Sequence, residues 1–216
     1  MNIILFGPPG VGKGTQGENI VRIFDLHKIS TGVLLRNEVQ KNTKLGIKIK
    51  SQIDKGLFVS DEIINDLIFN ILSNKKFFNR LIFDGCPRNL NQAKNLNLLL
   101  KKYNQKISCV LSLNADKEIL IKRVLGRQTC SNCNLIFNKY FNPSTNENHN
   151  CDPKFLEKRS DDNEKTIINR YEDYLDKTLP ILNFYEDLNL LHQINGMREI
   201  SVIFEEIRTI IASLEA

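Results

Sequence analysis

A glycine-rich segment directly after an apolar N-terminal run constrains the fold more than any other feature. Residues 2–6 read Asn-Ile-Ile-Leu-Phe, which predicts a short buried strand, and residues 7–15 read Gly-Pro-Pro-Gly-Val-Gly-Lys-Gly-Thr. We expect a helix to begin near Lys13, with the positive end of its dipole directed at the turn. The pattern is the P-loop G-x-x-x-x-G-K, whose N–H groups and lysine hold nucleotide phosphates. Positive φ is expected at Gly7, Gly10, Gly12 and Gly14.

The residue after Lys13 departs from the strict P-loop motif. That motif places Ser or Thr there as a ligand for Mg²⁺, whereas this chain has Gly14 followed by Thr15. A direct contact between a hydroxyl group of this turn and Mg²⁺ is therefore not assumed. The variant G-x-P-G-x-G-K-G-T resembles the nucleoside monophosphate kinases.

Composition and charge narrow the class of protein. The chain has 216 residues, 41% of them hydrophobic, which suits one compact domain with insertions. No apolar run reaches the roughly 18 residues of a membrane span, and the sequence enters a strand without a leader, so we expect a cytoplasmic protein and no membrane partner. A net charge of +5 suits a phosphate-rich ligand but is not concentrated in a basic stripe, so we expect no nucleic-acid partner. The five cysteines do not suggest a secreted disulfide scaffold.

Strand-like and helix-like segments alternate along the chain. Strands are predicted at residues 2–6, 26–29, 80–83, 107–113 and 190–194. Helices are predicted at residues 13–24, 61–72, 89–103, 116–125, 164–186 and 198–214. This alternation predicts an α/β fold with a parallel sheet covered by helices on both faces.

Two segments interrupt this alternation. Residues 30–59 are helical but polar, and residues 128–158 lack helical periodicity and are rich in Asn, Cys, Ser and aromatic residues, as in a small β lobe. Both lie between core elements, so we interpret them as insertions that move against the core. The predicted division is a core of residues 1–29, 60–126 and 161–216, a lobe of residues 30–59 and a lid of residues 127–160.

Further motifs follow the P-loop in a fixed order. They are Ile29-Ser30-Thr31-Gly32, Leu35-Arg36, Asp84-Gly85-Cys86-Pro87-Arg88 with Gln92, Arg123-Val124-Leu125-Gly126-Arg127, Arg159-Ser160-Asp161-Asp162, Arg170, and Asn195-Gly196. The ordered set spans nearly the whole chain and resembles the adenylate kinases of the bacterial long-lid type. The resemblance implies a P-loop core with a helical AMP-binding insertion and a small β lid. It also implies a monomer that binds ATP, AMP and ADP and catalyses Mg-ATP + AMP ⇌ 2 ADP by direct in-line transfer.

Phosphoryl transfer depends on positioning and on stabilising charge, so such a site needs many cations. Candidate phosphate ligands are Lys13, Arg36, Arg88, Arg123, Arg127, Arg159 and Arg170. The resemblance places Arg123 near the ATP adenine. The predicted catalytic residues are Lys13, Arg88, Arg127, Arg159, Arg170 and Asp84. Asp84 ends a core strand and is expected to organise Mg²⁺ through water.

The resemblance also implies two nucleotide sites. The ATP site is expected to comprise Gly10, Val11, Gly12, Lys13, Gly14, Thr15, Arg123, Arg127, Ile136, Phe137 and Arg198. The AMP site is expected to comprise Thr31, Arg36, Leu57, Phe58, Val59, Gly85, Cys86, Pro87, Arg88, Gln92, Arg159 and Arg170. Gln92 can form two hydrogen bonds with the edge of adenine. Cys86 stands where the family motif has an aromatic residue, which puts part of the packing beside this site in doubt.

The lid contains a cluster of candidate metal ligands. Cys130-Ser131-Asn132-Cys133 has the C-x₂-C spacing of a zinc knuckle. Related enzymes carry a second C-x₂-C, whereas this chain has His149-Asn150-Cys151-Asp152 and then Lys154. We expect a structural Zn²⁺ on Cys130, Cys133 and Cys151, with His149 as the favoured fourth ligand and Asp152 as the alternative. A gap-free alignment to Arg159 favours His149 together with Asp152. The alternative without metal is a lid held by hydrogen bonds.

Other interpretations are weaker. Thr31 and Gln92 argue against a UMP/CMP kinase, in whose relatives Ala tends to replace the threonine. A GTP-binding switch needs an N-K-x-D segment, and residues 138–141 read Asn-Lys-Tyr-Phe. A zinc-stabilised nucleic-acid module is disfavoured because residues 130–153 are sparsely basic. Asp161 and Asp162 either bind the lid arginines or cap the helix that begins near Glu164, and the two roles are compatible.

Overall fold

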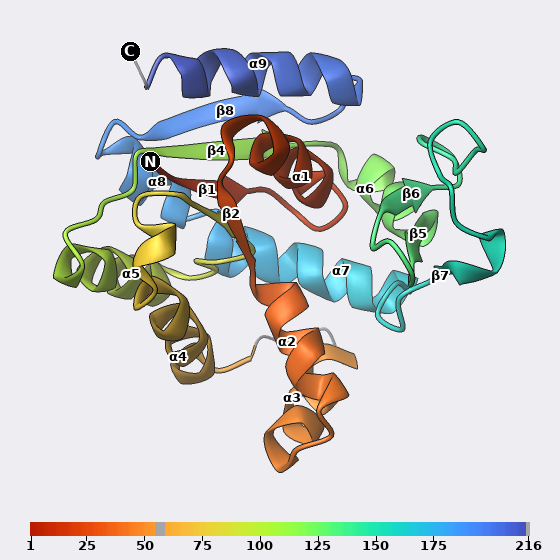
Figure 1. The fold of residues 1–216 in the computed structure, drawn as a ribbon, viewed down its shortest axis with the longest axis horizontal. Coiled ribbons are helices and arrows are strands. Elements are labelled where there is room, and N and C mark those ends of the chain that lie inside the picture. The colour runs from red at the N-terminus through yellow and green to blue at the C-terminus, as the bar shows by residue number, and fades with distance from the viewer. Residues whose placement is uncertain (55–58, 215–216) are drawn as a thin grey trace.

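The computed structural model describes residues 1–54 and 59–214. Five parallel strands form the central sheet in the order β2-β3-β1-β4-β8 (Figure 1). The strands are β1 (Asn2–Phe6), β2 (His27–Ser30), β3 (Leu81–Asp84), β4 (Cys109–Asn114) and β8 (Leu191–Asn195). Each strand after β1 begins one or two residues later than predicted, but the predicted parallel sheet is confirmed.

The apolar side chains of β1 alternate between two cores, one on each face of the sheet. Ile3 and Leu5 pack with α1 (Lys13–Phe24), α6 (Lys117–Leu125) and α9 (Ile200–Ala212). Ile4 and Phe6 pack with α4 (Asp61–Leu72), α5 (Leu90–Lys102) and α8 (Ile181–Glu186). A strand covered on both faces must be apolar at every position, and all five residues of β1 are buried.

The two predicted insertions form separate bodies beside the sheet (Figure 1). Residues 31–54 fold into α2 (Thr31–Gln40) and α3 (Lys44–Asp54), which pack on each other. Residues 127–157 contain a small antiparallel sheet in the order β6-β5-β7, formed by β5 (Arg127–Cys130), β6 (Ile136–Asn138) and β7 (Leu156–Glu157). Short 3₁₀ helices, η1 (Lys75–Phe77) and η2 (Pro153–Phe155), precede β3 and β7. The helical and β characters predicted for these insertions are confirmed.

One predicted helix is wrong in its extent. Residues 164–186 form α7 (Glu164–Asp173), a π-helical turn η3 (Tyr174–Thr178) and α8, instead of one helix. Pro180 has no N–H group to continue an α-helix, and its ring would clash with the carbonyl four residues earlier. The backbone relieves this conflict with a wider turn, in which Leu179 N donates to Tyr174 O at 2.8 Å. In the part of the chain that the structure describes, no helix is long and apolar enough to span a bilayer.

Candidate functional site

The glycine-rich turn after β1 leads directly into the N-terminus of α1. Gly7, Gly10 and Gly12 have φ values of 142°, 86° and 107°. A Cβ atom at Gly7 would lie 2.5 Å from the carbonyl oxygen of Leu113, so a side chain there would displace β4. Gly14 does not share this backbone, which corrects the prediction: it lies inside α1. Because the N-cap Gly12 has no side chain to accept a hydrogen bond, the first N–H groups of α1 are left for an anion.

Lys13 folds back over the turn and lies among other charged groups. Its Nζ donates to Gly7 O at 2.7 Å and to Pro8 O at 2.9 Å. Burial lowers the pKa of Lys13 from 10.5 to about 8; Asp84 opposes this shift, and Arg88 and Arg127 add to it. Asp84 ends β3, in register with Leu5 of β1 and with Ser30 of β2. The turn, the carboxyl end of β3 and two arginines of other segments thus meet at one place.

Five arginines from separate parts of the chain form one network of neighbouring charges with Lys13, and we call these six residues the cation cluster. The arginines are Arg36 of α2, Arg88 of the β3–α5 loop, Arg127 of β5, Arg159 after β7 and Arg170 of α7. Burial, and next Arg127 and Arg36, lower the pKa of Arg159 to about 10. Burial is the main cause that lowers the pKa of Arg88, and the nearby charge of Arg170 is the next. Burial is also the main cause that lowers the pKa of Arg36. Cations that depress one another's pKa form a site for a highly charged anion.

Two neighbouring carboxylates hold part of the cation cluster. Arg127 binds Asp162 in a bidentate pair, with Nε at 2.8 Å from Oδ2 and Nη2 on Oδ1. Nη2 of Arg170 lies 2.6 Å from Oδ2 of Asp161. The N-cap of α7 is Asn163, so the capping interpretation of the two aspartates is wrong. Asp162 binds the lid residue Arg127 as predicted, whereas the partner of Asp161 is Arg170 of α7, outside the predicted lid. The carboxylates thus hold cations of β5 and α7 in place.

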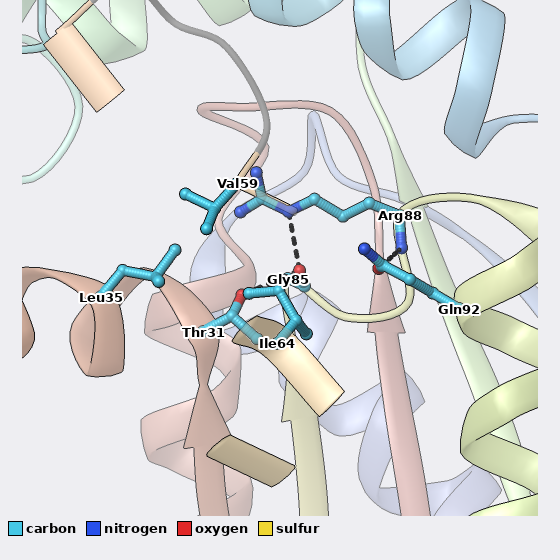
Figure 2. Close-up of a pocket in the computed structure, with 7 residues that line it drawn as sticks. All are labelled: Thr31, Leu35, Val59, Ile64, Gly85, Arg88 and Gln92. Atoms are coloured by element: carbon cyan, nitrogen blue, oxygen red, sulfur yellow. Dashed lines mark hydrogen bonds between the residues drawn. The ribbon is translucent and has the colours of Figure 1, made fainter. Parts of the chain in front are cut away.

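A pocket opens between α2, α4 and the β3–α5 loop (Figure 2). Its polar side is formed by Thr31, Gly85, Arg88 and Gln92, and its apolar side by Leu35, Val59 and Ile64. Thr31 Oγ1 and Arg88 Nε both donate to Gly85 O, at 2.9 and 2.7 Å. Gly85 has φ +81°, and a Cβ atom there would lie 2.9 Å from Thr31 Oγ1. Apolar walls with a few convergent polar groups suit a planar base that carries a phosphate toward Arg88.

Not every predicted AMP residue lines this pocket. Cys86 and Pro87 are buried beside it, and burial raises the pKa of the Cys86 thiol to about 12. Leu57 and Phe58 lie outside the described residues. Arg36, Arg159 and Arg170 belong to the cation cluster instead of the pocket lining.

The predicted metal ligands of the lid converge. The ligand atoms of Cys130, Cys133, His149 and Cys151 all lie within 4.8 Å of one another. Nδ1 of His149 hydrogen-bonds Ser144 Oγ at 2.9 Å, and its buried Nε2 has no hydrogen-bond partner. Although burial raises the pKa of Cys130, the N–H group of Cys133 helps to lower it to about 6. Thiolate character at Cys130 and an unpaired imidazole nitrogen fit a tetrahedral Cys₃His zinc site.

The alternative fourth ligand is not part of this cluster. Asp152 accepts from Lys154 N at 2.9 Å and lies 3.1 Å from Lys154 Nζ, so its carboxylate caps η2. The structure therefore groups the three cysteines with His149, as the favoured prediction had it.

Comparison with known proteins decides the family. The adenylate kinase family model matches residues 5–190. The chain is 47% identical to the adenylate kinase of Pelagibacter ubique, over 98% of this chain and 99% of that protein. It is 40% identical to the adenylate kinase of Bacillus cytotoxicus (99% and 100% covered) and 38% identical to that of Enterococcus faecalis (98% and 99% covered). The chain belongs to the adenylate kinase family.

The structure brings together only some of the predicted ATP residues. Arg123 Nη1 donates to Gly196 O at 2.7 Å and contacts Val11 O at 3.4 Å, which ties α6 to the P-loop and to the end of β8. A Cβ atom at Gly14 would lie 3.4 Å from Ile136 Cδ1, so the lid reaches α1 through Ile136.

Two other predicted ATP residues direct their side chains elsewhere. The ring of Phe137 is buried, 4.7 Å from the ring of His149. The guanidinium of Arg198 pairs with Glu206 on α9.

Sequence reasoning missed one residue that holds a side chain of the pocket lining. The carboxylate of Asp61 accepts from Gln92 Nε2 at 2.5 Å and from Asn89 Nδ2 at 3.1 Å. Ser60-Asp61-Glu62 has the pattern of any acidic helix start, so the sequence carries no signal for this contact. The contact depends on how α4 packs beside α5, which only the fold determines.

Proposed function

We propose that this chain catalyses the reversible, Mg²⁺-dependent transfer of a phosphoryl group from ATP to AMP, which yields two ADP. The observation that carries the proposal is that the P-loop and the Thr31–Gln92 pocket meet at one cation cluster. Two nucleotides held on either side of these cations would bring their phosphates together for direct in-line transfer. Such a reaction needs positioning and charge stabilisation and no covalent nucleophile of the protein.

Roles within the cation cluster follow from position. Lys13 and the N-terminus of α1 would bind the β- and γ-phosphates of ATP, and Arg88 the phosphate of AMP. Arg127, Arg159 and Arg170 would stabilise the transferring group. Arg127 lies close enough to Lys13, and Arg170 to Arg88, to lower the pKa of each, and Arg159 neighbours Arg127. Arg36 would add charge on the AMP side.

The residues present also fit a magnesium ion. Asp84 is an incompletely buried carboxylate close enough to Lys13 to oppose the shift of its pKa. A carboxylate that holds Mg²⁺ through water is the usual arrangement for this ion, which neutralises charge on the ATP phosphates.

We further propose that the two insertions close over the bound nucleotides. Residues 30–59 would cover AMP and residues 127–160 would cover ATP, against a core of residues 1–29, 60–126 and 161–216. Closure would exclude water, which otherwise accepts the phosphoryl group. Ile136 near Gly14 and the Arg127–Asp162 pair support a lid hinged next to the P-loop.

We further propose that the lid binds a structural Zn²⁺ through Cys130, Cys133, His149 and Cys151. The buried, unpaired Nε2 of His149 supports this assignment, because a polar atom left unsatisfied in the interior is costly. All four ligands would come from the protein, so the metal would stabilise the lid without an open position for catalysis.

The test is ADP formation by the purified chain with Mg-ATP and each of AMP, CMP, UMP and GMP. Fast turnover with AMP alone supports the proposal and the roles of Thr31 and Gln92 in base recognition. Preference for another monophosphate would discard that base assignment, and no transfer to any of them would discard the activity. A monomeric state and a cytoplasmic location stay predictions, which sedimentation and cell fractionation test.

A further inference from the structure

The carboxamide of Gln92 is held by two partners of opposite chemistry. Its Oε1 accepts from the backbone N of Arg88 at 2.7 Å (Figure 2), and its Nε2 donates to Asp61 Oδ1 at 2.5 Å. A backbone N–H group can only donate and an ionised carboxylate can only accept. The two ends of the amide therefore cannot exchange places without the loss of both hydrogen bonds.

Asp61 is itself held in position. Asn89 Nδ2 lies 3.1 Å from both carboxylate oxygens of Asp61, and Asn89 Oδ1 accepts from Gln92 N at 2.8 Å. The side chain of Asn89 thus joins the start of α4 to the first turn of α5. Gln92 is only 3% exposed, so water could not easily replace a hydrogen bond lost there.

This arrangement leaves the amide one free N–H and one free lone pair, in a fixed order. Adenine carries a donor at its 6-amino group beside the acceptors N1 and N7, whereas a 6-oxopurine carries an acceptor at position 6. If the cation cluster anchors the phosphate, the base cannot turn over to match a reversed amide. An amide whose oxygen and nitrogen are fixed in one order can therefore hydrogen-bond one class of purine. With the other class, it would place donor against donor and acceptor against acceptor.

We propose that Asp61 is a specificity-determining positioning residue that fixes the polarity of the Gln92 amide and so selects a 6-aminopurine over a 6-oxopurine monophosphate. The inference rests on the proposed function for the assignment of AMP to this pocket. Asp61 acts through Gln92 and need not touch the base. Without its carboxylate, the amide gains freedom to reverse, and the discrimination between the two classes falls.

The experiment compares AMP with inosine monophosphate, which carries an oxo group in place of the 6-amino group. For wild type and Asp61→Ala, kcat/KM is measured with Mg-ATP for both monophosphates, and dissociation constants are measured by calorimetry without ATP. We expect the AMP preference of Asp61→Ala to fall roughly 10- to 100-fold, the range for loss of a bidentate base contact, mainly through KM for AMP. The KM for ATP should stay unchanged.

Control variants separate positioning from folding. Glu62→Ala removes an exposed acid from the same first turn of α4 and should keep the preference. Asp61→Asn is nearly isosteric and keeps one oxygen that can accept from Gln92 Nε2, so it should retain more of the preference than Asp61→Ala. In a Gln92→Ala background, Asp61→Ala should change the preference no further.

The outcomes are distinct. If the preference of Asp61→Ala stays within twofold of wild type, or if it falls equally with and without Gln92, the role of Asp61 is overturned, while AMP turnover leaves the proposed function standing. Selective binding of AMP that depends on Asp61, without any transfer from ATP, would overturn the proposed function and support the role of Asp61.

Discussion

Lys13 gives the sharpest test of the phosphate site, because its pKa links nucleotide affinity to pH. The free protein buries Lys13 among cations and lowers its pKa to about 8. Phosphate binding requires the protonated amine, so ATP affinity should decline as pH rises through this pKa. The protonated fraction falls from roughly three-quarters at pH 7.5 to roughly 3% at pH 9.5, which predicts an affinity loss of about 25-fold for a pKa near 8.

The assay is calorimetric titration with Mg-ATP in the absence of AMP, so that no transfer occurs. Buffers with different ionisation enthalpies report the proton that Lys13 gains on binding above pH 8. The variant Lys13→Met should bind weakly with no such slope. Lys28→Met, which removes a lysine that pairs with Glu18 on α1, should keep the decline of ATP affinity with rising pH. A wild-type affinity that changes less than threefold, or an equal decline in Lys13→Met, would refute the reasoning.

The sign of the same linkage can be checked on stability. The folded pKa of Lys13 is depressed, so between pH 8 and the usual value of 10.5 the unfolded chain binds the proton that the folded chain has lost. Its contribution to the free energy of unfolding therefore grows as pH rises through this window and is lost below it. The difference between wild type and Lys13→Met in denaturant titrations isolates this contribution.

Three other perturbations test separate parts of the site. Arg88→Ala should lower kcat roughly 100- to 1000-fold with an unchanged circular dichroism spectrum, while Arg80→Ala, which removes an exposed arginine paired with Asp25, should keep turnover; near-normal turnover of Arg88→Ala would contradict its role. Asp162→Asn leaves Arg127 without its bidentate partner and should lower the free energy of unfolding by about 3–5 kcal/mol, as loss of one partner from a buried pair does; a thermal melt that does not move would contradict the pair's role. Elemental analysis should find about one zinc per chain, with chelation or Cys151→Ser lowering the lid's resistance to proteolysis and Asp152→Asn leaving it unchanged; a purified chain that never holds metal would remove the zinc proposal.

Sequence reasoning predicted best where one local signal decides the structure. The strand, glycine turn and helix around Lys13 lie where the pattern places them, because the steric demands at Gly7 and the buried alternation of β1 are local. The helix break at Pro180 was missed because the apolar spacing typical of a helix continues through residues 164–186. That spacing was given more weight than the single proline. Position within the chain does not show whether proline ends a helix or is absorbed by a π turn.

Side-chain direction and partner choice were beyond the sequence. Ile136 and Phe137 are adjacent on β6, so a strand must direct them to opposite sides, yet only the fold shows that Phe137 faces His149. Spacing left His149 and Asp152 open as the fourth candidate ligand, and only the fold places His149 with the three cysteines while Asp152 pairs with Lys154. Asp61 likewise has an ordinary helix-start pattern, and its contact with Gln92 arises only from the packing of α4 beside α5.

The paired aspartates explain how so many cations can share one site without nucleotide. Each arginine of the cluster lies near others, and burial with these neighbours lowers the pKa of Arg36, Arg88 and Arg159. Asp161 and Asp162 offset part of this repulsion, yet each carboxylate pairs with a single arginine and leaves a surplus of positive charge. The surplus positive charge lies between the P-loop and the Thr31–Gln92 pocket. The negative charges of the nucleotide phosphates would neutralise the part that the two aspartates do not. Catalysis by such a site follows from preorganisation, because the cations need not be assembled when the transition state forms.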